Sequence, residues 1–430
     1  MIRKELYKGV NLNIIDSDKF KTNYLSVCFV LPLEEKNAHL NSLVVKLLSR
    51  GSRKFPSIAH ISQRLEYLYA AEISTIFYKR GQSIVAGFFA DFIKDDFVPQ
   101  GKSLLADVCE VLFDLVFNPL VEDGKFNEQY TQGEKKDLIN IINSKLDNKA
   151  VYAKEACVSA MYEGNPYGLC IHGKVEDVDK ATPEQIYDRY CTITRECPIE
   201  ICFNGKCDNL ELEKLIKKSV PLNENRINNF PQTSILSGEP EKVKELEEKM
   251  PVAQGKLVMG FRIGGVTVNS SDTFAFALFN EILGGSASSK LFLNVREALS
   301  LCYYCKSMPD QFMSNMFISS GIENKNKDLA QREILKQLEA MKSGDFTQEH
   351  IEQAKLSIKN SYKALDDSAH SIMRWYVSRI IAGNSDTPEQ VCDGILKVTK
   401  QEIIDVAKKV CLDTVFFLRG TQYEKTQGEE

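Results

Sequence analysis

The feature that most constrains this fold is an internal repeat, because the second half of the chain follows the pattern of the first. KLDNKAVYAKEACVSAMYEGN at 145–165 aligns with ALDDSAHSIMRWYVSRIIAGN at 364–384, an offset of 219. LSVCFVL at 25–31 and LVMGFRI at 257–263 share an alternation of apolar residues, at an offset of 232. TPEQIYD at 182–188 likewise parallels TKQEIID at 399–405. Loop insertions explain the slow drift of the offset, so the chain contains two copies of one unit of normal domain size.

The repeat predicts two homologous domains, one over residues 1–217 and the other over 251–430. The segment 218–250 between them is polar and rich in charge, Pro and Asn, and it is interpreted as a linker. Each half has the order strand, helix, helix, hairpin, helices and final strand; the first hairpin joins ISTIFYK to SIVAGFFADF through RGQ. Long helices combined with hairpins predict an α+β fold, with a mainly antiparallel sheet and helices on one face in each domain.

Charge and hydropathy exclude two classes of partner. The formal net charge is −5, and the sequence has no basic run that would attract nucleic acid or an anionic membrane. The N-terminal segment has no apolar signal core, and no run of 18 apolar residues occurs. The 12 cysteines are scattered, which favours reduced thiols over a disulfide framework. We therefore expect a cytoplasmic protein that binds neither nucleic acid nor membrane.

One pair of cysteines has the spacing of a Cys-x-x-Cys motif. Cys302 and Cys305 lie in LCYYCKSM, which is predicted to be a strand. A structural zinc site usually needs a second pair with matching spacing, and none follows. A thioredoxin-like dithiol would lie at a turn from strand to helix. Buried free cysteines are therefore the favoured interpretation.

The two-domain pattern resembles the M16 metallopeptidases, the family of insulinase, pitrilysin and the mitochondrial processing peptidase. The most specific match is GGSASSKLFLNVREALSLCYY at 284–304, which is similar to the family's glycine loop followed by Ser-(Ser/Arg)-Leu-Phe, Arg-Glu and Leu-x-Tyr. The resemblance covers nearly the whole chain. It implies two domains of the LuxS/MPP-like metallohydrolase fold.

The resemblance also locates a zinc site that this chain has lost. HLNSLVVKLLSRGS at 39–52 is predicted to be an amphipathic helix that ends at a left-handed Gly51. Active members carry His-x-x-Glu-His on this helix and a third ligand, a Glu, on a later helix. The four positions are occupied here by Ser42, Val45, Lys46 and Ile141, the last lying seven residues beyond Glu134. None of these side chains is suited to hold or use zinc. We therefore expect no cofactor in this chain, and zinc only in a partner.

The second half keeps residues that contact substrate in active relatives. By resemblance, Arg296 and Tyr303 would contact the peptide, since they keep the family's seven-residue spacing. A guanidinium can donate to a peptide carbonyl, and a phenol can donate to a developing oxyanion. The glycine loop with Gly284, Gly285 and Ser286 would touch the substrate or the facing domain.

Three functions follow from this pattern. The leading hypothesis is a non-catalytic subunit that pairs with a zinc-bearing M16 homologue and contributes chamber wall and Arg/Tyr contacts to peptide processing. The peptide would add as a strand to a sheet edge, as is usual in the family. The alternative is a non-proteolytic peptide-binding or scaffold protein that forms a homodimeric chamber. The third, less favoured, is an autonomous peptidase with a rearranged site that uses Cys302, Cys305 and a histidine.

Overall fold

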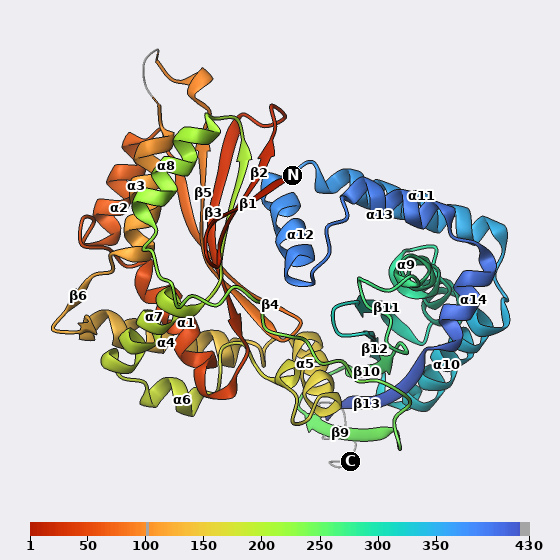
Figure 1. Cartoon of the computed structure of the whole chain (residues 1–430). Coiled ribbons are helices and arrows are strands. Elements are labelled where there is room, and N and C mark those ends of the chain that lie inside the picture. The colour runs from red at the N-terminus through yellow and green to blue at the C-terminus, as the bar shows by residue number, and fades with distance from the viewer. Residues whose placement is uncertain (100–102, 422–430) are drawn as a thin grey trace. The chain divides into compact units, whose positions relative to one another are not determined.

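The computed structural model describes residues 1–99 and 103–421, and these form two compact units. Unit 1 combines residues 1–144, 169–232 and 368–377, and unit 2 combines 145–168, 233–367 and the chain from 378 onward. Each unit pairs a sheet with packed helices, which confirms the α+β prediction (Figure 1). Among the described residues, no helix combines the length and the apolar character needed to cross a membrane.

The sheet of unit 1 has six strands and is antiparallel except at one pair. Its order is β1 (Ile2–Tyr7), β2 (Val10–Asp16), β8 (Ile199–Gly205), β3 (Thr22–Pro32), β5 (Ser83–Ile93) and β4 (Glu72–Arg80). β2 and β8 run parallel. β4 and β5 form the predicted hairpin, with Arg80 paired to Ser83 across the turn. β4 is therefore an edge strand with one side free of strand partners in this sheet.

The helices of unit 1 gather on one face of this sheet (Figure 1). They are α1 (Glu35–Leu48), α2 (Ile58–Tyr67), α3 (Leu105–Phe117), α4 (Glu128–Ser144), α6 (Val175–Lys180), α7 (Pro183–Glu196) and α8 (Asn209–Ser219), with the short η1 (Asp95–Phe97) and the ribbon β6 (Val121–Glu122) and β7 (Lys125–Phe126). Alternate residues of β3, including Leu25, Val27 and Phe29, point into the core that these helices close. The period of two in the sequence thus selects the buried face.

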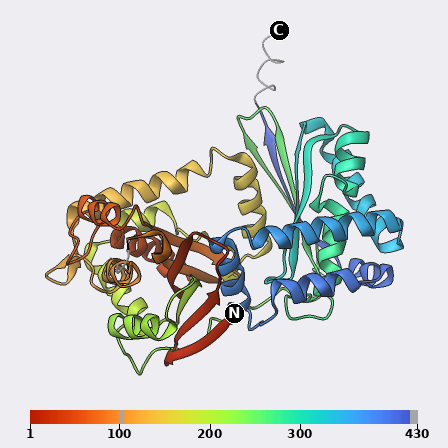
Figure 2. The same cartoon turned by 90° about the horizontal axis from the view of Figure 1, so that it is seen from above.

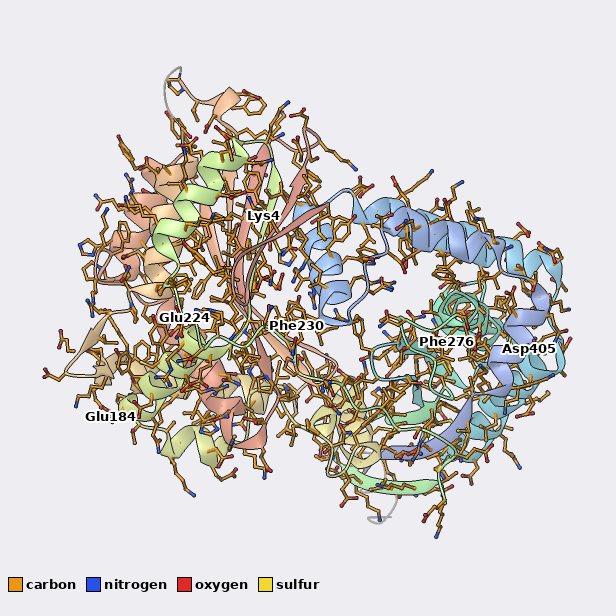
Figure 3. The ribbon with its side chains drawn as sticks, viewed as in Figure 1. Lys4, Glu184, Glu224, Phe230, Phe276 and Asp405 are labelled. Carbon is orange, nitrogen blue, oxygen red and sulfur yellow. The ribbon has the colours of Figure 1, made fainter. Side chains whose placement is uncertain are left out.

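Unit 2 repeats this plan with five strands. The order is β11 (Cys302–Asp310), β12 (Asn315–Ile322), β10 (Gly255–Arg262), β13 (Cys411–Gly420) and β9 (Lys244–Met250). Its helical segments are α5 (Lys149–Met161), η2 (Pro166–Gly168), α9 (Thr273–Asn280), η3 (Glu281–Gly285), η4 (Leu291–Ala298), η5 (Asn324–Asn326), α10 (Lys327–Ser343), α11 (Gln348–Leu365), α13 (Pro388–Lys397) and α14 (Lys400–Lys408). Phe276 of α9 is buried in the unit, whereas Asp405 of α14 is exposed (Figure 3).

The two halves exchange one helix each. α5 belongs to the first half of the sequence but packs in unit 2, against β10 and β13. Most of α12 (Ala369–Ile381) belongs to the second half but packs in unit 1, where the His370 ring lies 5.8 Å from the Tyr24 ring. Figure 2 shows α12 in blue beside the strands of unit 1 and α5 in yellow beside those of unit 2. The exchanged helices cover the sheet faces that the other helices leave open.

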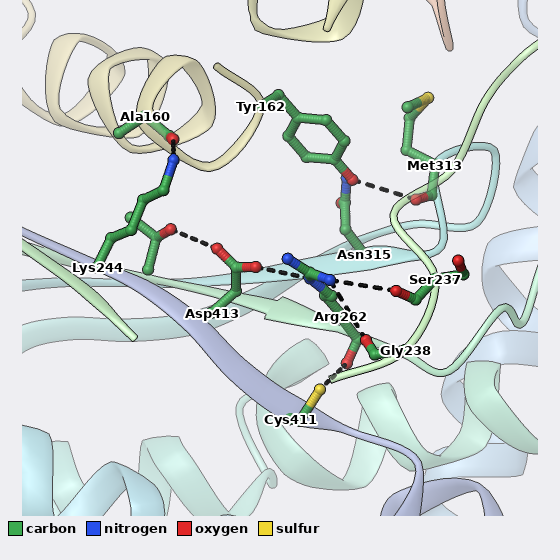
Figure 4. A network of polar contacts seen from close by, with 11 residues as sticks. Ala160, Tyr162, Ser237, Gly238, Lys244, Arg262, Met313, Asn315, Cys411 and Asp413 are labelled. Carbon is green, nitrogen blue, oxygen red and sulfur yellow. Dashed lines mark hydrogen bonds and ion pairs between the residues drawn. The ribbon is translucent and has the colours of Figure 1, made fainter. Parts of the chain in front are cut away.

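A buried tyrosine anchors the exchanged segment in unit 2. Tyr162, directly after α5, is 1% exposed. Its hydroxyl donates to the Met313 carbonyl at 3.2 Å and accepts from Asn315 Nδ2 at 2.7 Å (Figure 4). Gly260 of β10 leaves room for the same segment, since a Cβ there would stand 2.9 Å from Met161 Sδ.

Three details differ from the sequence-based expectations. α1 ends at Leu48 with a right-handed Ser49, and Gly51 has no positive φ, so the predicted left-handed stop is wrong. Gly51 is needed instead for close packing, because a Cβ would stand 2.9 Å from the Phe55 carbonyl oxygen. The last seven residues of the segment interpreted as a linker form β9, parallel to β13. The compact units also divide the chain differently from the repeat, because they exchange 145–168 and 368–377.

The anchor generates a prediction about stability. Tyr162→Phe removes two hydrogen bonds and leaves the Met313 carbonyl and the Asn315 amide buried without them. We expect a loss of about 1–3 kcal/mol in the free energy of unfolding, measured by chemical denaturation. Tyr303→Phe is the matched control, because this ring is 62% exposed; it should change stability by less than about 0.5 kcal/mol. Equal effects of the two substitutions would contradict the anchor.

Candidate functional site

The predicted zinc helix carries no ligands and is filled by packing. Ser42 and Val45 of α1 are 3% and 6% exposed, and Lys46 is half-buried on the next turn. This face of α1 is therefore an interior face, which packs against α4 and the segment before α6. What replaces the metal is a set of direct contacts between side chains.

An ion-pair cluster occupies the position of the second predicted histidine. Lys46 Nζ lies 3.0 Å from Glu134 Oε2, and Arg50 Nε contacts the other oxygen of the same carboxylate. The Glu134 side chain is 4% exposed, whereas Lys46 and Arg50 are 26% and 29% exposed. Arg50 also reaches Asp137 at 3.6 Å. A buried carboxylate requires such compensation, so the Lys46 ammonium is fixed where a ligand would have to be.

The position of the first predicted histidine is engaged in a different way. Ser42 Oγ lies 3.0 Å from His172 Nδ1 and donates to the Ile171 carbonyl at 3.4 Å. The His172 ring stacks on Phe77 of β4, with centroids 5.5 Å apart. Ser42 therefore joins α1 to the loop before α6 and, through His172, to the edge strand of the sheet. Because the serine is buried, its hydroxyl is unsuited to attack a substrate.

The third predicted ligand position, Ile141, is exposed to solvent. Ile141 lies on α4, seven residues beyond Glu134 and so on the same helical face, and it is 39% exposed. Within residues 1–99 and 103–421, no group of three or more His, Cys, Asp or Glu side chains is placed to hold a metal ion.

The glycine loop of the second half starts within η3, whose last two residues are Gly284 and Gly285, and leads to η4; both segments are π-helical. Such segments are rare in proteins overall, and those that occur are often found at functional sites. Gly284 breaks the helical geometry and packs against β11, where a Cβ would stand 2.8 Å from the Ser307 nitrogen. At Gly285 a Cβ would meet Glu281 Oε2 at 2.4 Å. Ser286 Oγ lies 3.1 Å from Ser288 Oγ. Close packing against the backbone of β11 thus requires glycine at 284, whereas at 285 the nearest atom is the end of the flexible Glu281 side chain.

Arg296 and Tyr303 lie on neighbouring elements of unit 2, η4 and β11. The Arg296 guanidinium stands 4.4 Å from the Phe292 ring centre, with Nη1 3.3 Å from Glu297 Oε1. Its side chain remains 38% exposed. Tyr303 is 62% exposed at a β-bulge, where the register against β12 shifts between Cys302 and Tyr304. The predicted substrate contacts of the second half thus lie on neighbouring elements of unit 2, and both are exposed to solvent.

Two residues of the first half were not found from the sequence. Arg50 lies four residues beyond Lys46, so it shares a helical face with it and could have been assigned to Glu134. No motif in the sequence singles out His172, and only the fold places it against Ser42. Two other histidines have local roles: His60 contacts the N-cap Ser57 of α2, and His350 completes a capping box with Thr347.

Comparisons with known proteins support one family. The family model described as "Peptidase M16 inactive domain" matches residues 180–358. A protein of Bacillus subtilis strain 168, described as probable inactive metalloprotease YmfF, is 31% identical over 419 residues, which is 97% of this chain and 98% of that protein. The crystal structure of a conserved protein from Enterococcus faecalis V583 matches with a TM-score of 0.91 and 29% identity, over 98% of this chain and 99% of that chain. A peptidase M16 inactive domain from Pseudomonas fluorescens shares the fold, with a TM-score of 0.77 and 15% identity over 98% of both chains.

These contacts predict the metal content of the chain. After expression with zinc and dialysis, we expect far less than one zinc per chain by elemental analysis, because Lys46 repels the ion and three ligands are missing. S42H/K46H/I141E restores the ligands and should raise bound zinc toward one per chain. S42H/K46H is the control, since two ligands should not retain the metal. A wild-type chain that retains about one zinc would overturn the assignment, and the cysteines would become the first suspects.

Proposed function

The chain belongs to the M16 peptidase family as an inactive member, and on this premise we propose that it acts as the non-catalytic subunit of a zinc endopeptidase. The partner is a zinc-bearing homologue. This chain contributes chamber wall and substrate contacts, and the partner contributes the metal, so the chain itself needs no cofactor.

The observation that carries the proposal is the contrast between the two halves. In unit 1 the ligand positions are occupied by buried contacts, above all the Lys46–Glu134–Arg50 cluster. In unit 2 the predicted contacts Arg296 and Tyr303 are exposed and sit beside a glycine loop that close packing keeps in shape. A chain that had lost all peptide processing would need no exposed guanidinium and phenol at the family's spacing.

The chemistry of this pair fits a peptide near a partner's metal. Arg296 Nη1 pairs with Glu297 and the guanidinium stacks on Phe292, which leaves other N–H donors of the group for a peptide carbonyl. The Tyr303 hydroxyl can donate to the oxyanion that forms when water adds to the scissile carbonyl. Both interactions strengthen as negative charge develops, so both lower the barrier of the reaction.

The peptide itself is proposed to add as a strand to β4. β4 is an edge of the sheet in unit 1, and its Phe77 contacts His172, the partner of Ser42. Main-chain hydrogen bonds to this edge would provide affinity for an extended peptide. A cytoplasmic location is part of the proposal and is supported by 12 cysteines that are all free.

A scaffold role is the second candidate. Loss of the metal positions suits a homodimeric chamber that binds peptide without cleaving it as well as it suits a subunit of a peptidase. The exposed Arg296 and Tyr303 favour the peptidase complex. The two candidates predict different partners, a zinc-bearing homologue in one case and a second copy of this chain in the other.

The test is reconstitution with a zinc-bearing M16 homologue encoded in the same genome. We expect the pair to cleave peptides that the present chain alone does not. Arg296→Ala and Tyr303→Phe should lower kcat/KM of the pair by roughly 10- to 100-fold, because each removes a donor to developing charge. Arg332→Ala, an exposed arginine on α10 of the same unit, is the control and should leave turnover unchanged.

Two results would refute the proposal. Unchanged turnover in both Arg296→Ala and Tyr303→Phe would remove these residues from the site. A chain that pairs only with itself, and adds nothing to the activity of the homologue, would leave the scaffold role instead.

A further inference from the structure

The Cys-x-x-Cys pair is brought together by the β-bulge in β11. Cys302 pairs with Ile322 of β12, and Cys305 pairs with Ser320, so Tyr303 is the extra residue on β11. Without the bulge, residues three apart would point to opposite faces of the strand. With it, both cysteines face the same side, with an expected Cα separation of about 6.6 Å, two steps along a strand. That is near the upper end of the range that a disulfide spans.

The surroundings of the pair are polar although both residues are buried. Cys302 is 8% exposed and Cys305 is 4% exposed, and the bulge aligns both on one face of β11. The hydroxyl of Ser320 is buried and forms no regular hydrogen bond within the described residues, which leaves it to the Cys302 sulfur. The Arg296 guanidinium of η4 is the charged group that favours the Cys302 thiolate. The Glu281 carboxylate of η3 is engaged elsewhere, since it accepts a hydrogen bond from Ser357.

This environment makes the two thiols unequal. The hydrogen bond from Cys305, with help from Ser320 and Arg296 and against the effect of burial, lowers the pKa of Cys302 to about 7. The same hydrogen bond and burial raise the pKa of Cys305 well above its ordinary value. Eight of the described cysteines have a raised pKa, and Cys302 alone has a lowered one. The pair thus consists of a nucleophile and a second thiol that can resolve its adduct.

We propose that Cys302 and Cys305 form a reversible dithiol–disulfide site that reacts with low-molecular-weight disulfides. The bulge places both sulfurs on one face of an edge strand, beside an unpartnered hydroxyl and a guanidinium. Cys302 begins that strand, directly after a segment in which Leu299 is 46% exposed and Ser300 has a φ of 49°. Local opening at this end of the edge strand gives a small disulfide access.

The exchange balances in two steps. The Cys302 thiolate attacks one sulfur of RSSR, which forms a mixed disulfide and releases RS⁻. Cys305 then loses its proton and attacks the Cys302 sulfur, which forms the internal disulfide and releases the second RS⁻. The two protein thiols lose two electrons and two protons, and the reagent gains them as two RSH.

The reaction has a consequence that rests on the proposed function. Oxidation removes the thiolate that faces Arg296 and cross-links the bulge that carries Tyr303. Both predicted substrate contacts then lie in a changed environment, so thiol exchange would set the activity of the complex. The internal disulfide itself can be tested without any partner.

The experiment uses the full chain alone with glutathione disulfide as the probe. Trypsin releases both cysteines on one fragment, 297–306, EALSLCYYCK. After exchange at pH 7, alkylation and non-reducing digestion, we expect this fragment to be two hydrogen atoms lighter than its thiol form and free of alkyl groups. A doubly alkylated fragment, or one that retains glutathione, would overturn the proposal.

Variants separate the two roles. Cys305→Ser should stop at a glutathione adduct on Cys302, whereas Cys302→Ser should leave Cys305 unreacted. Arg296→Gln should slow the first step at pH 7 by roughly two- to fivefold, because losing the positive charge raises the pKa of Cys302. Cys411 is the internal control, since burial raises its pKa and it should react only at higher pH. Equal rates at Cys302 and Cys411 would contradict the inference.

Discussion

The structure depends on covering both faces of each sheet. The strands carry apolar residues on both faces, so each face must be packed against helices to keep water out. In unit 2, the helices on one face bury Leu257 and Phe261, while Val258 and Phe416 face α5 on the other. α5 comes from the first half of the sequence, so neither half closes its own sheet. Small side chains such as Ala153 and Cys157 allow α5 to approach closely. A repeat that reads as two separate domains is therefore folded as one interdependent pair.

This exchange also bears on the lost metal site. α4, which carries Glu134, ends at Ser144, and the chain continues directly into the exchanged segment of unit 2. A helix that connects to such a segment cannot be removed when its catalytic role disappears. What changed is the chemistry on its surface, where Lys46 and Arg50 neutralise the Glu134 carboxylate. The cluster keeps α1 and α4 together by ion pairing at one of the positions that the family resemblance predicts for a zinc ligand.

The features that the sequence could predict are those set by residues close together in the chain. Features set by contacts between distant residues could not be predicted. Periodicity and turn residues act locally, so the strands β3, β4, β5, β10 and β11 and the α+β class were predicted from residues close in the chain. The helix exchange could not be, because α5 has the same local pattern whichever sheet it covers. The end of α1 was misjudged because Gly51 is required by packing against Phe55, a tertiary contact, and not by a helix stop. Lys46 was recognised as unable to bind metal. Its ion pair with Glu134 could not be predicted, because the two residues are 88 positions apart in the chain and lie on different helices.

Cys302 and Cys305 were interpreted as buried free cysteines because no second pair follows and they lie in a strand, and their alignment depends on a feature that the spacing does not show. Spacing alone puts residues i and i+3 of a strand on opposite faces, and a pair on opposite faces cannot exchange thiols. One inserted residue reverses that conclusion, and the inserted residue is Tyr303. The bulge that exposes the phenol is thus the feature that aligns the thiols, and Arg296 is close enough to favour the thiolate. The proposed peptide contact of Tyr303 and the proposed thiol exchange of Cys302 and Cys305 therefore depend on one local distortion of β11.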